Sequence, residues 1–307
     1  MKYGITFSHR HLKYLNLSID NALEFAVSME FDSIRLGCYW REVEKEKENY
    51  DFSSLHKILS YCEEKGQGVV MNLGVKSPRY PEFYWPKYLE IRDFSDKNSI
   101  QRLYKFIEMT VDELKKYQRI KMWQVENEPL DPSGPDGKVV PLDVLKNEIA
   151  IIKANDSRPI LLTVWGNDAS NRNTIPTLLP ICDFLGLDIY YRVYEGRGFG
   201  GNKYSGIDHL LPFFTDILNQ NPDKVLVAEM QAEPWEDNDN SFWKSKSLTK
   251  KVGSISAQKL KRNLEKTKAM GFRNIYFWGF EYWYLNYIES KSNYVNTVKK
   301  LMSISDE

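Results

Sequence analysis

Cysteine and histidine are scarce in this sequence of 307 residues. The three cysteines, Cys38, Cys62 and Cys182, lie far apart and form no CxxC pair, so neither a zinc knuckle nor a disulfide framework is indicated. Among the four histidines, His9 and His11 are near enough in sequence to flank a metal ion, but nothing downstream completes a ligand set. We therefore predict an enzyme without a metal or another cofactor.

An excess of charge of either sign is also lacking. Lys and Arg number 42, Asp and Glu number 42, and the isoelectric point is near 6.9. This balance argues against binding to nucleic acid or to an anionic membrane, because both demand a basic face. No apolar run is long enough to cross a membrane. Met1 and Lys2 lead directly into an expected strand without a signal peptide, so we expect a cytoplasmic location, or a secreted one if a leader has been removed.

No GxGxxG or Walker pattern follows an early strand, which weighs against a doubly wound nucleotide-binding sheet. The stretch Gly196–Gly201 is rich in glycine, but it follows tyrosines instead of opening a helix, and we interpret it as a flexible loop. We find no internal repeat, low-complexity tract or linker. The sequence therefore predicts one catalytic domain over residues 1–307.

Short apolar runs alternate with longer amphipathic runs along the whole chain. The expected strands are Tyr3–Phe7, Ser33–Cys38, Gly68–Leu73, Ile120–Val125, Ile160–Trp165, Phe184–Tyr190, Lys224–Glu229 and Asn274–Phe280. The expected helices are Ile19–Met29, Ser53–Lys65, Asn98–Lys116, Leu142–Asn155, a short turn at Ile175–Pro180, Ile207–Asn219, Ser256–Met270 and Ser292–Met302. Eight repeats of strand and helix in a chain of this length predict the α/β fold class and a single (β/α)8 TIM barrel.

Carboxylates stand at the ends of the fourth and seventh expected strands. Glu126, Asn127 and Glu128 follow the fourth strand, and Glu229 ends the seventh. In a (β/α)8 barrel the active site lies at the carboxyl ends of the strands, and these two strands lie on opposite sides of the ring. Glycoside hydrolysis needs such a pair, with one carboxyl protonated and the other ionised. We therefore predict that Glu128 and Glu229 are catalytic, with Glu233 as the alternative to Glu229.

Aromatic residues are abundant, with 8 Trp, 19 Tyr and 15 Phe, and many lie in polar segments. Flat rings edged by polar groups suit a sugar, whose C–H faces stack on rings while its hydroxyls form hydrogen bonds. We therefore expect an oligosaccharide, polysaccharide or glycoside as substrate. Further residues near the expected strand ends are predicted to contact it, namely Trp40, Arg79, Glu82, Trp235 and Glu281.

The segment Asn127-Glu128-Pro129 resembles the acid/base motif of the clan A glycoside hydrolases, which are retaining (β/α)8 enzymes. In that resemblance Glu229 looks like the nucleophile, and Tyr190 looks like the tyrosine that binds it. Arg35 resembles the arginine of the second strand, and Trp278 resembles the tryptophan that forms the floor of the first sugar site. The likeness implies that Asn127 holds the 2-hydroxyl of the sugar.

Two further segments extend the likeness. Trp40–Glu44 followed by Tyr50–Ser53 is similar to a segment of the β-galactosidase-like members. Asp188, which we predict to support the substrate site, departs from the pattern, because several families have histidine there. The resemblance covers nearly the whole chain and implies a retaining β-glycosidase of a poorly characterised branch similar to cellulase-like and β-galactosidase-like families. A transglycosylase using the same pair and a non-catalytic sugar-binding barrel remain alternatives. The sugar, the linkage, endo or exo action and the oligomeric state are not predicted.

Overall fold

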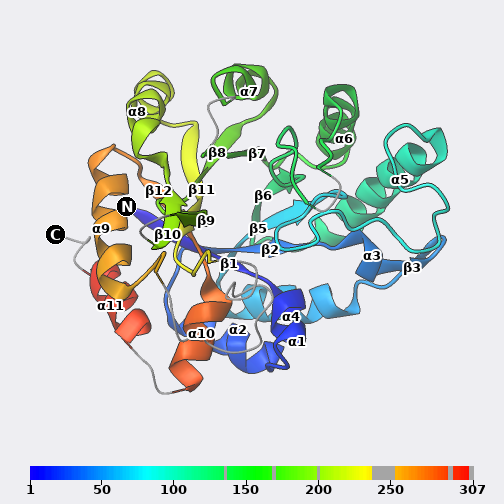
Figure 1. Cartoon of the computed structure of the whole chain (residues 1–307). Helices are drawn as coiled ribbons and strands as arrows, with labels where there is room; N and C mark the ends of the chain where they lie inside the picture. Colours follow the sequence, from blue (N-terminus) through cyan, green and yellow to red (C-terminus); the bar gives the residue numbers. More distant parts are fainter. Residues whose placement is uncertain (135–136, 168–170, 199–200, 237–252, 290–292, 304–307) are drawn as a thin grey trace. The chain divides into compact units, whose positions relative to one another are not determined.

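The computed structural model describes the chain except for residues 135–136, 168–170, 199–200, 237–252, 290–292 and 304–307 (Figure 1). The chain forms two compact units, each built from separate stretches of sequence. Unit 1 consists of Met1–Asp32, Trp165–Ala169 and Gly186–Glu307, and unit 2 consists of Ser33–Val164 and Ser170–Leu185. The prediction of a single domain stays a prediction.

Unit 2 contains four parallel strands in the order β2, β5, β6 and β7. Their bounds are Ser33–Gly37, Gly68–Leu73, Ile120–Val125 and Ile160–Trp165, with Trp165 counted in unit 1. The register pairs Arg35 with Val70 and Leu73 with Val125. Nearly every residue of these strands is buried, as expected for parallel strands that are covered on both faces.

The helices of unit 2 begin and end at residues with clear local causes. The Asp96 side chain accepts a hydrogen bond from the Ser99 N–H at 2.8 Å and caps α5, and Gly66, with φ of 73°, ends α4. The elements are α3 Trp40–Val43, α4 Ser53–Lys65, α5 Lys97–Leu114, α6 Leu142–Asn155, α7 Asn171–Leu178, η1 Leu179–Ile181 and a hairpin of β3 Glu44–Glu46 with β4 Asn49–Tyr50.

Unit 1 contains strands β1, β12 and β11, and most of β8. Strand β12 pairs in parallel with both β1 and β11. The strand bounds are β1 Lys2–Phe7, β8 Phe184–Ile189, β11 Val225–Gln231 and β12 Asn274–Trp278. The helices are α1 His9–Tyr14, α2 Ile19–Ser28, η2 Ile207–His209, α8 Leu211–Gln220, α9 Ala257–Ala269, α10 Phe280–Ile288 and α11 Asn293–Ser303.

The eight long strands form one closed barrel in the order β1, β12, β11, β8, β7, β6, β5, β2. This confirms the predicted (β/α)8 fold, and all eight expected strands are present. In the described part of the chain, no helix is both long and apolar enough to cross a membrane.

Two local predictions are wrong. The glycine-rich stretch Gly196–Gly201 belongs to a hairpin of β9 Val193–Gly198 and β10 Gly201–Ser205, although residues 199–200 lie outside the described residues. The short turn expected at Ile175–Pro180 is the end of α7 followed by η1. Tyr194 and Tyr204 are paired across this hairpin. The glycines of the segment hid its strand pattern in the sequence.

Candidate active site

Arg35 on β2 organises the polar interior of unit 2. Its Nε atom donates to Oε1 of Gln124 at 2.5 Å, and its Nη2 atom donates to Oδ1 of Asn127 at 2.5 Å. A guanidinium group can only donate, so the Asn127 amide must turn its oxygen toward Arg35. Its Nδ2 group therefore faces away from Arg35 as a donor, which suits a sugar hydroxyl.

Glu128 lies three residues beyond β6 and is nearly buried. Its φ of 45° is in the left-handed region, which residues other than glycine rarely adopt. Its backbone N–H donates to Oγ1 of Thr163 on β7 at 2.8 Å, and its carbonyl oxygen accepts a hydrogen bond from Nζ of Lys76 at 2.7 Å. Hydrogen bonds thus fix the backbone of Glu128, the predicted acid/base, on both sides of its Cα atom.

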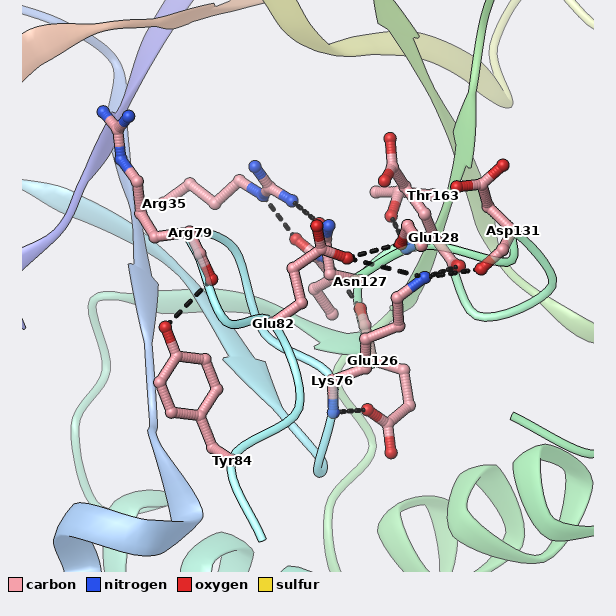
Figure 2. Close-up of polar contacts among 12 residues, drawn as sticks. Arg35, Lys76, Arg79, Glu82, Tyr84, Glu126, Asn127, Glu128, Asp131 and Thr163 are labelled. Carbon is pink, nitrogen blue, oxygen red and sulfur yellow. Dashed lines mark hydrogen bonds and ion pairs between the residues drawn. The ribbon is translucent and has the colours of Figure 1, made fainter. Parts of the chain in front are cut away.

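Lys76 and Glu126 link the loops that follow β5 and β6. Figure 2 shows the Lys76 ammonium between Glu128 and Asp131, and its Nζ also donates to the Asp131 carbonyl oxygen at 2.8 Å. The Glu126 carboxylate accepts hydrogen bonds from the backbone N–H groups of Val75, at 2.9 Å, and of Lys76. The Glu126 side chain thus binds the backbone of the loop that follows β5.

Glu126 has a second carboxyl group as its neighbour, that of Glu148 on α6. Both side chains are fully buried. Burial raises the pKa of Glu126 to about 7, and burial together with the nearby Glu126 carboxylate raises the pKa of Glu148 well above its usual range. The pair therefore retains a proton at neutral pH. Gly74 makes room for it, because a Cβ atom there would lie 2.3 Å from Cδ of Glu126.

Glu229 lies in β11 of unit 1 and is nearly buried. The Tyr190 hydroxyl donates to Oε2 of Glu229 at 2.7 Å, as the resemblance implied. Asn167 fixes the Tyr190 backbone from both sides, because its Nδ2 donates to the Tyr190 carbonyl oxygen at 2.7 Å and its Oδ1 accepts from the Tyr190 N–H at 3.2 Å. The Tyr190 phenol thus fixes the position of one carboxylate oxygen of Glu229.

Three aromatic rings cluster beside Glu229. The Trp165 ring centroid lies 4.9 Å from that of Tyr190 and 5.6 Å from that of Trp235, and Tyr190 and Trp235 are 5.0 Å apart. Trp165 and Trp235 are partly exposed, so they offer apolar faces to a ligand. Trp278 is more enclosed, and its Nε1 donates to Oε1 of Glu233 at 2.9 Å.

Two of the predicted substrate contacts are fully enclosed in the structure. Trp40 is fully buried, where it stacks on Phe106 with centroids 5.3 Å apart and donates from Nε1 to Glu44 at 2.7 Å. Glu281 is also fully buried, and its Oε1 accepts a hydrogen bond from the Ser8 N–H at 2.6 Å. Both side chains are engaged within their own units, and their contact with a substrate stays a prediction.

The other predicted contacts have varied surroundings. Glu82 accepts a hydrogen bond from the Ser133 hydroxyl and lies 3.9 Å from Nζ of Lys76, so it is engaged within unit 2. Arg79 has a left-handed φ of 82°, and in Figure 2 its side chain extends away from the Lys76 cluster. Asp188 is fully buried near the end of β8. Its role, like that of Arg79, stays a prediction.

The predicted site did not include Lys76, Thr163, Gln124 or Asn167. All four lie at or just beyond the carboxyl end of a barrel strand, so their position was a usable signal. Their functions depend on which backbone groups they reach, and that information is absent from a pattern of residue types.

The closed barrel with a glutamate at the carboxyl ends of β6 and β11 defines the class, a (β/α)8 glycoside hydrolase of clan A. The model of the cellulase family, glycosyl hydrolase family 5, matches residues 6–193, more than half of the chain. The chain therefore belongs to glycosyl hydrolase family 5, and the resemblance to clan A is confirmed. No curated protein matches the chain by sequence.

Solved structures share the fold at low identity. The exo-β-1,4-mannosidase Op5Man5 from Opitutaceae bacterium strain TAV5 has a TM-score of 0.65 and 18% identity, over 91% of this chain and 51% of that one. A GH5_18 protein from Streptomyces cattleya in complex with GlcNAc has a TM-score of 0.64 and 12% identity, over 90% and 70%. The β-galactosidase from the psychrophilic Marinomonas ef1 has a TM-score of 0.60 and 10% identity, over 90% and 54%. This chain thus spans about half the length of the first of these proteins.

Proposed function

We propose that this protein is a retaining β-glycoside hydrolase in which Glu229 is the nucleophile and Glu128 is the acid/base. The observation that carries the proposal is the hydrogen bond from the Tyr190 hydroxyl to Glu229, which orients that carboxylate. Two observations support the role of Glu128 as the acid/base. The chain belongs to family 5, and Glu128 lies in an Asn-Glu-Pro segment just after β6.

The reaction follows from two carboxyl groups in different states of protonation. The ionised Glu229 attacks the anomeric carbon, while the proton of Glu128 passes to the departing oxygen as the glycosidic C–O bond breaks. The product is a covalent glycosyl-enzyme. Glu128, now ionised, removes a proton from water, and the resulting attack on the anomeric carbon releases the sugar and restores both residues.

Other residues of the two units would bind the substrate. The Nδ2 group of Asn127, turned away from Arg35, suits the 2-hydroxyl, whose hydrogen bond strengthens in the transition state. Trp165 and Trp235 offer partly exposed rings beside Tyr190 for the C–H face of a sugar. We propose a β-mannoside as the first sugar to test, because the first two of the structures above are an exo-β-1,4-mannosidase and a GH5_18 protein of which a further structure holds Manβ1-4GlcNAc.

A panel of aryl β-glycosides tests the proposal, with mannoside, glucoside, galactoside and glucuronide members. We expect the wild type to hydrolyse at least one member and the Glu229→Ala variant to hydrolyse none. Proton NMR of the first product should show the β-anomer, and a first product of inverted configuration would refute the retaining mechanism. A crystal structure should place the two carboxyl groups about 5–5.5 Å apart.

Added acceptor sugars separate the alternatives. A transglycosylase would give mainly the transfer product at low acceptor concentration, while a hydrolase gives mainly the free sugar. A non-catalytic sugar-binding barrel would bind members of the panel without hydrolysing them. The wild type and Glu229→Ala would then behave alike.

A further inference from the structure

The Lys76 ammonium is wholly buried, and its hydrogen bonds go to a single turn of the chain. Nζ donates to the carbonyl oxygens of Glu128 and Asp131, at 2.7 and 2.8 Å, and the Asp131 N–H donates to that same Glu128 oxygen at 3.0 Å. The carboxylate of Glu82 lies 3.9 Å from Nζ and balances its charge. A buried charge is costly unless it is paired and hydrogen-bonded, and Lys76 is paired by Glu82 and hydrogen-bonded by the turn that carries Glu128.

The contact between the two loops is reciprocal. Lys76 binds the turn that follows β6 through its side chain, and Glu126, just past β6, binds the Lys76 backbone N–H through its carboxylate. The Val75 N–H donates to the same carboxylate at 2.9 Å, over the space that Gly74 leaves open. Movement of either loop would break hydrogen bonds on both, so the two loops hold each other in one arrangement.

Glu128 needs this support because its backbone is in an unfavourable conformation. A left-handed φ in a residue other than glycine persists only where the surroundings fix it. Thr163 fixes the N–H of Glu128, and Lys76 fixes its carbonyl oxygen. These two bonds flank the Cα atom from which the side chain departs, so they fix the direction in which the side chain leaves the backbone.

We infer that Lys76 is a positioning residue for the general acid/base and acts on catalysis through the carbonyl oxygen of Glu128. The inference rests on the proposed function, in which Glu128 delivers a proton to the departing oxygen. Lys76 has no exposed surface, and its donors meet carbonyl oxygens and Glu82. Neither a Schiff base with the substrate nor a direct contact with a uronic acid fits that environment.

The substitution Lys76→Met tests the inference, because methionine keeps the apolar stem and removes the donor. Aryl β-glycosides of the preferred sugar should be compared across leaving groups, from dinitrophenol, which departs without a proton, to alkylphenols, which require one. We expect kcat/KM to fall about 10–100-fold for the poorest leaving group and to stay within a few-fold of wild type for the best. KM should change little, because no contact with the substrate is lost.

Three further variants make the result decisive. Lys76→Met with Glu82→Gln removes both charges together, so it replaces the single variant if the unpaired Glu82 prevents folding. Lys105→Met, at an exposed residue of α5 that pairs with Glu108 at 2.7 Å, is the matched control and should behave as wild type. Glu128→Ala should show the same dependence on the leaving group as Lys76→Met, with a larger loss.

The outcomes separate the inference from the proposed function. If Glu128→Ala depends on the leaving group but the Lys76 variants lose activity equally for all substrates, or lose none, Lys76 is not a positioning residue. If Glu128→Ala itself shows no such dependence, Glu128 is not the general acid, and both the proposed function and the inference fail.

Discussion

Glu128 and Glu229 are held in place by different means. Glu229 lies inside β11, at a shift in the register with β12 between Val227 and Met230, and the Tyr190 hydroxyl binds its carboxylate. Glu128 lies beyond the end of β6, so no ladder reaches it, and side chains from neighbouring loops and strands must fix its backbone instead. The backbone of Glu229 is thus part of a barrel strand, while that of Glu128 is fixed by side chains from other segments.

The largest effect should come from the strand-borne carboxylate itself. The substitution Glu229→Ala removes the group that forms the covalent bond, and we expect kcat to fall by about 10⁴-fold or more for every leaving group. Steady-state rates across the aryl glycoside panel give the measurement. If the variant kept a tenth of the wild-type activity, Glu229 would not be the nucleophile. Glu233, four residues further along, would then be the candidate.

The free energy of unfolding should depend on pH mainly through the buried carboxyl pair Glu126 and Glu148. The raised pKa values of Glu126 and Glu148 mean that the folded state holds protons that the unfolded chain releases. Their stabilising contribution is complete below the unfolded pKa and is lost as pH rises through the folded pKa, which for Glu126 is about 7. For Glu126 the loss between pH 5 and 8 amounts to ~3 kcal/mol.

The substitution Glu148→Gln should flatten that slope, because an amide can still donate to Glu126 without titrating. Urea unfolding at several pH values between 5 and 8 gives the free energy of unfolding for each protein. The control is Glu64→Gln, at an exposed position of α4. Equal slopes in the wild type and in Glu148→Gln would show that the buried pair holds no extra proton.

Tyr190→Phe removes the one phenol that orients Glu229 and leaves its ring in place. A hydrogen bond to a charged group contributes about 1.5–3 kcal/mol, so kcat/KM should fall about 10–100-fold. The loss should be similar for all leaving groups, since nucleophilic attack is required for each of them. Tyr287→Phe, at an exposed residue of α10, is the control. A loss confined to poor leaving groups would show that Tyr190 assists the acid/base and not the nucleophile. The contrast between Glu128 and Glu229 would then fail.

The smallest effect should come from the aromatic cluster of unit 1. Trp235→Ala removes a partly exposed ring, and we expect KM to rise several-fold, since such a contact contributes about 1 kcal/mol. Trp40→Phe should lower the free energy of unfolding and leave KM unchanged, because Trp40 is fully buried. A rise in KM for Trp40→Phe would support the original prediction for that residue.

Local patterns predicted the fold well because each barrel strand is a short apolar run with polar flanks. The bounds of β5, β6 and β7 agree with the sequence at both ends. The hydrogen bond between Tyr190 and Glu229 was also expected, because Tyr190 resembles the clan A tyrosine that binds the nucleophile. The remaining site residues stay predictions.

Burial was not predictable in the same way. Trp40 and Trp235 both lie in segments with polar neighbours, yet one is in the core and the other is partly exposed. The difference arises because Phe106, more than sixty residues further along the chain, packs on Trp40. No pattern within a few residues of a tryptophan contains that information.

By itself, the sequence determined the eight strands and the glutamates near the ends of two of them, because apolar periodicity and short motifs are local properties. The tertiary structure decided that the buried Lys76 ammonium binds the carbonyl oxygen of Glu128 and that Glu126 and Glu148 retain a proton between them. Each of these features joins residues that are far apart in the sequence, and each depends on the low polarity that exists only once the surrounding chain has packed.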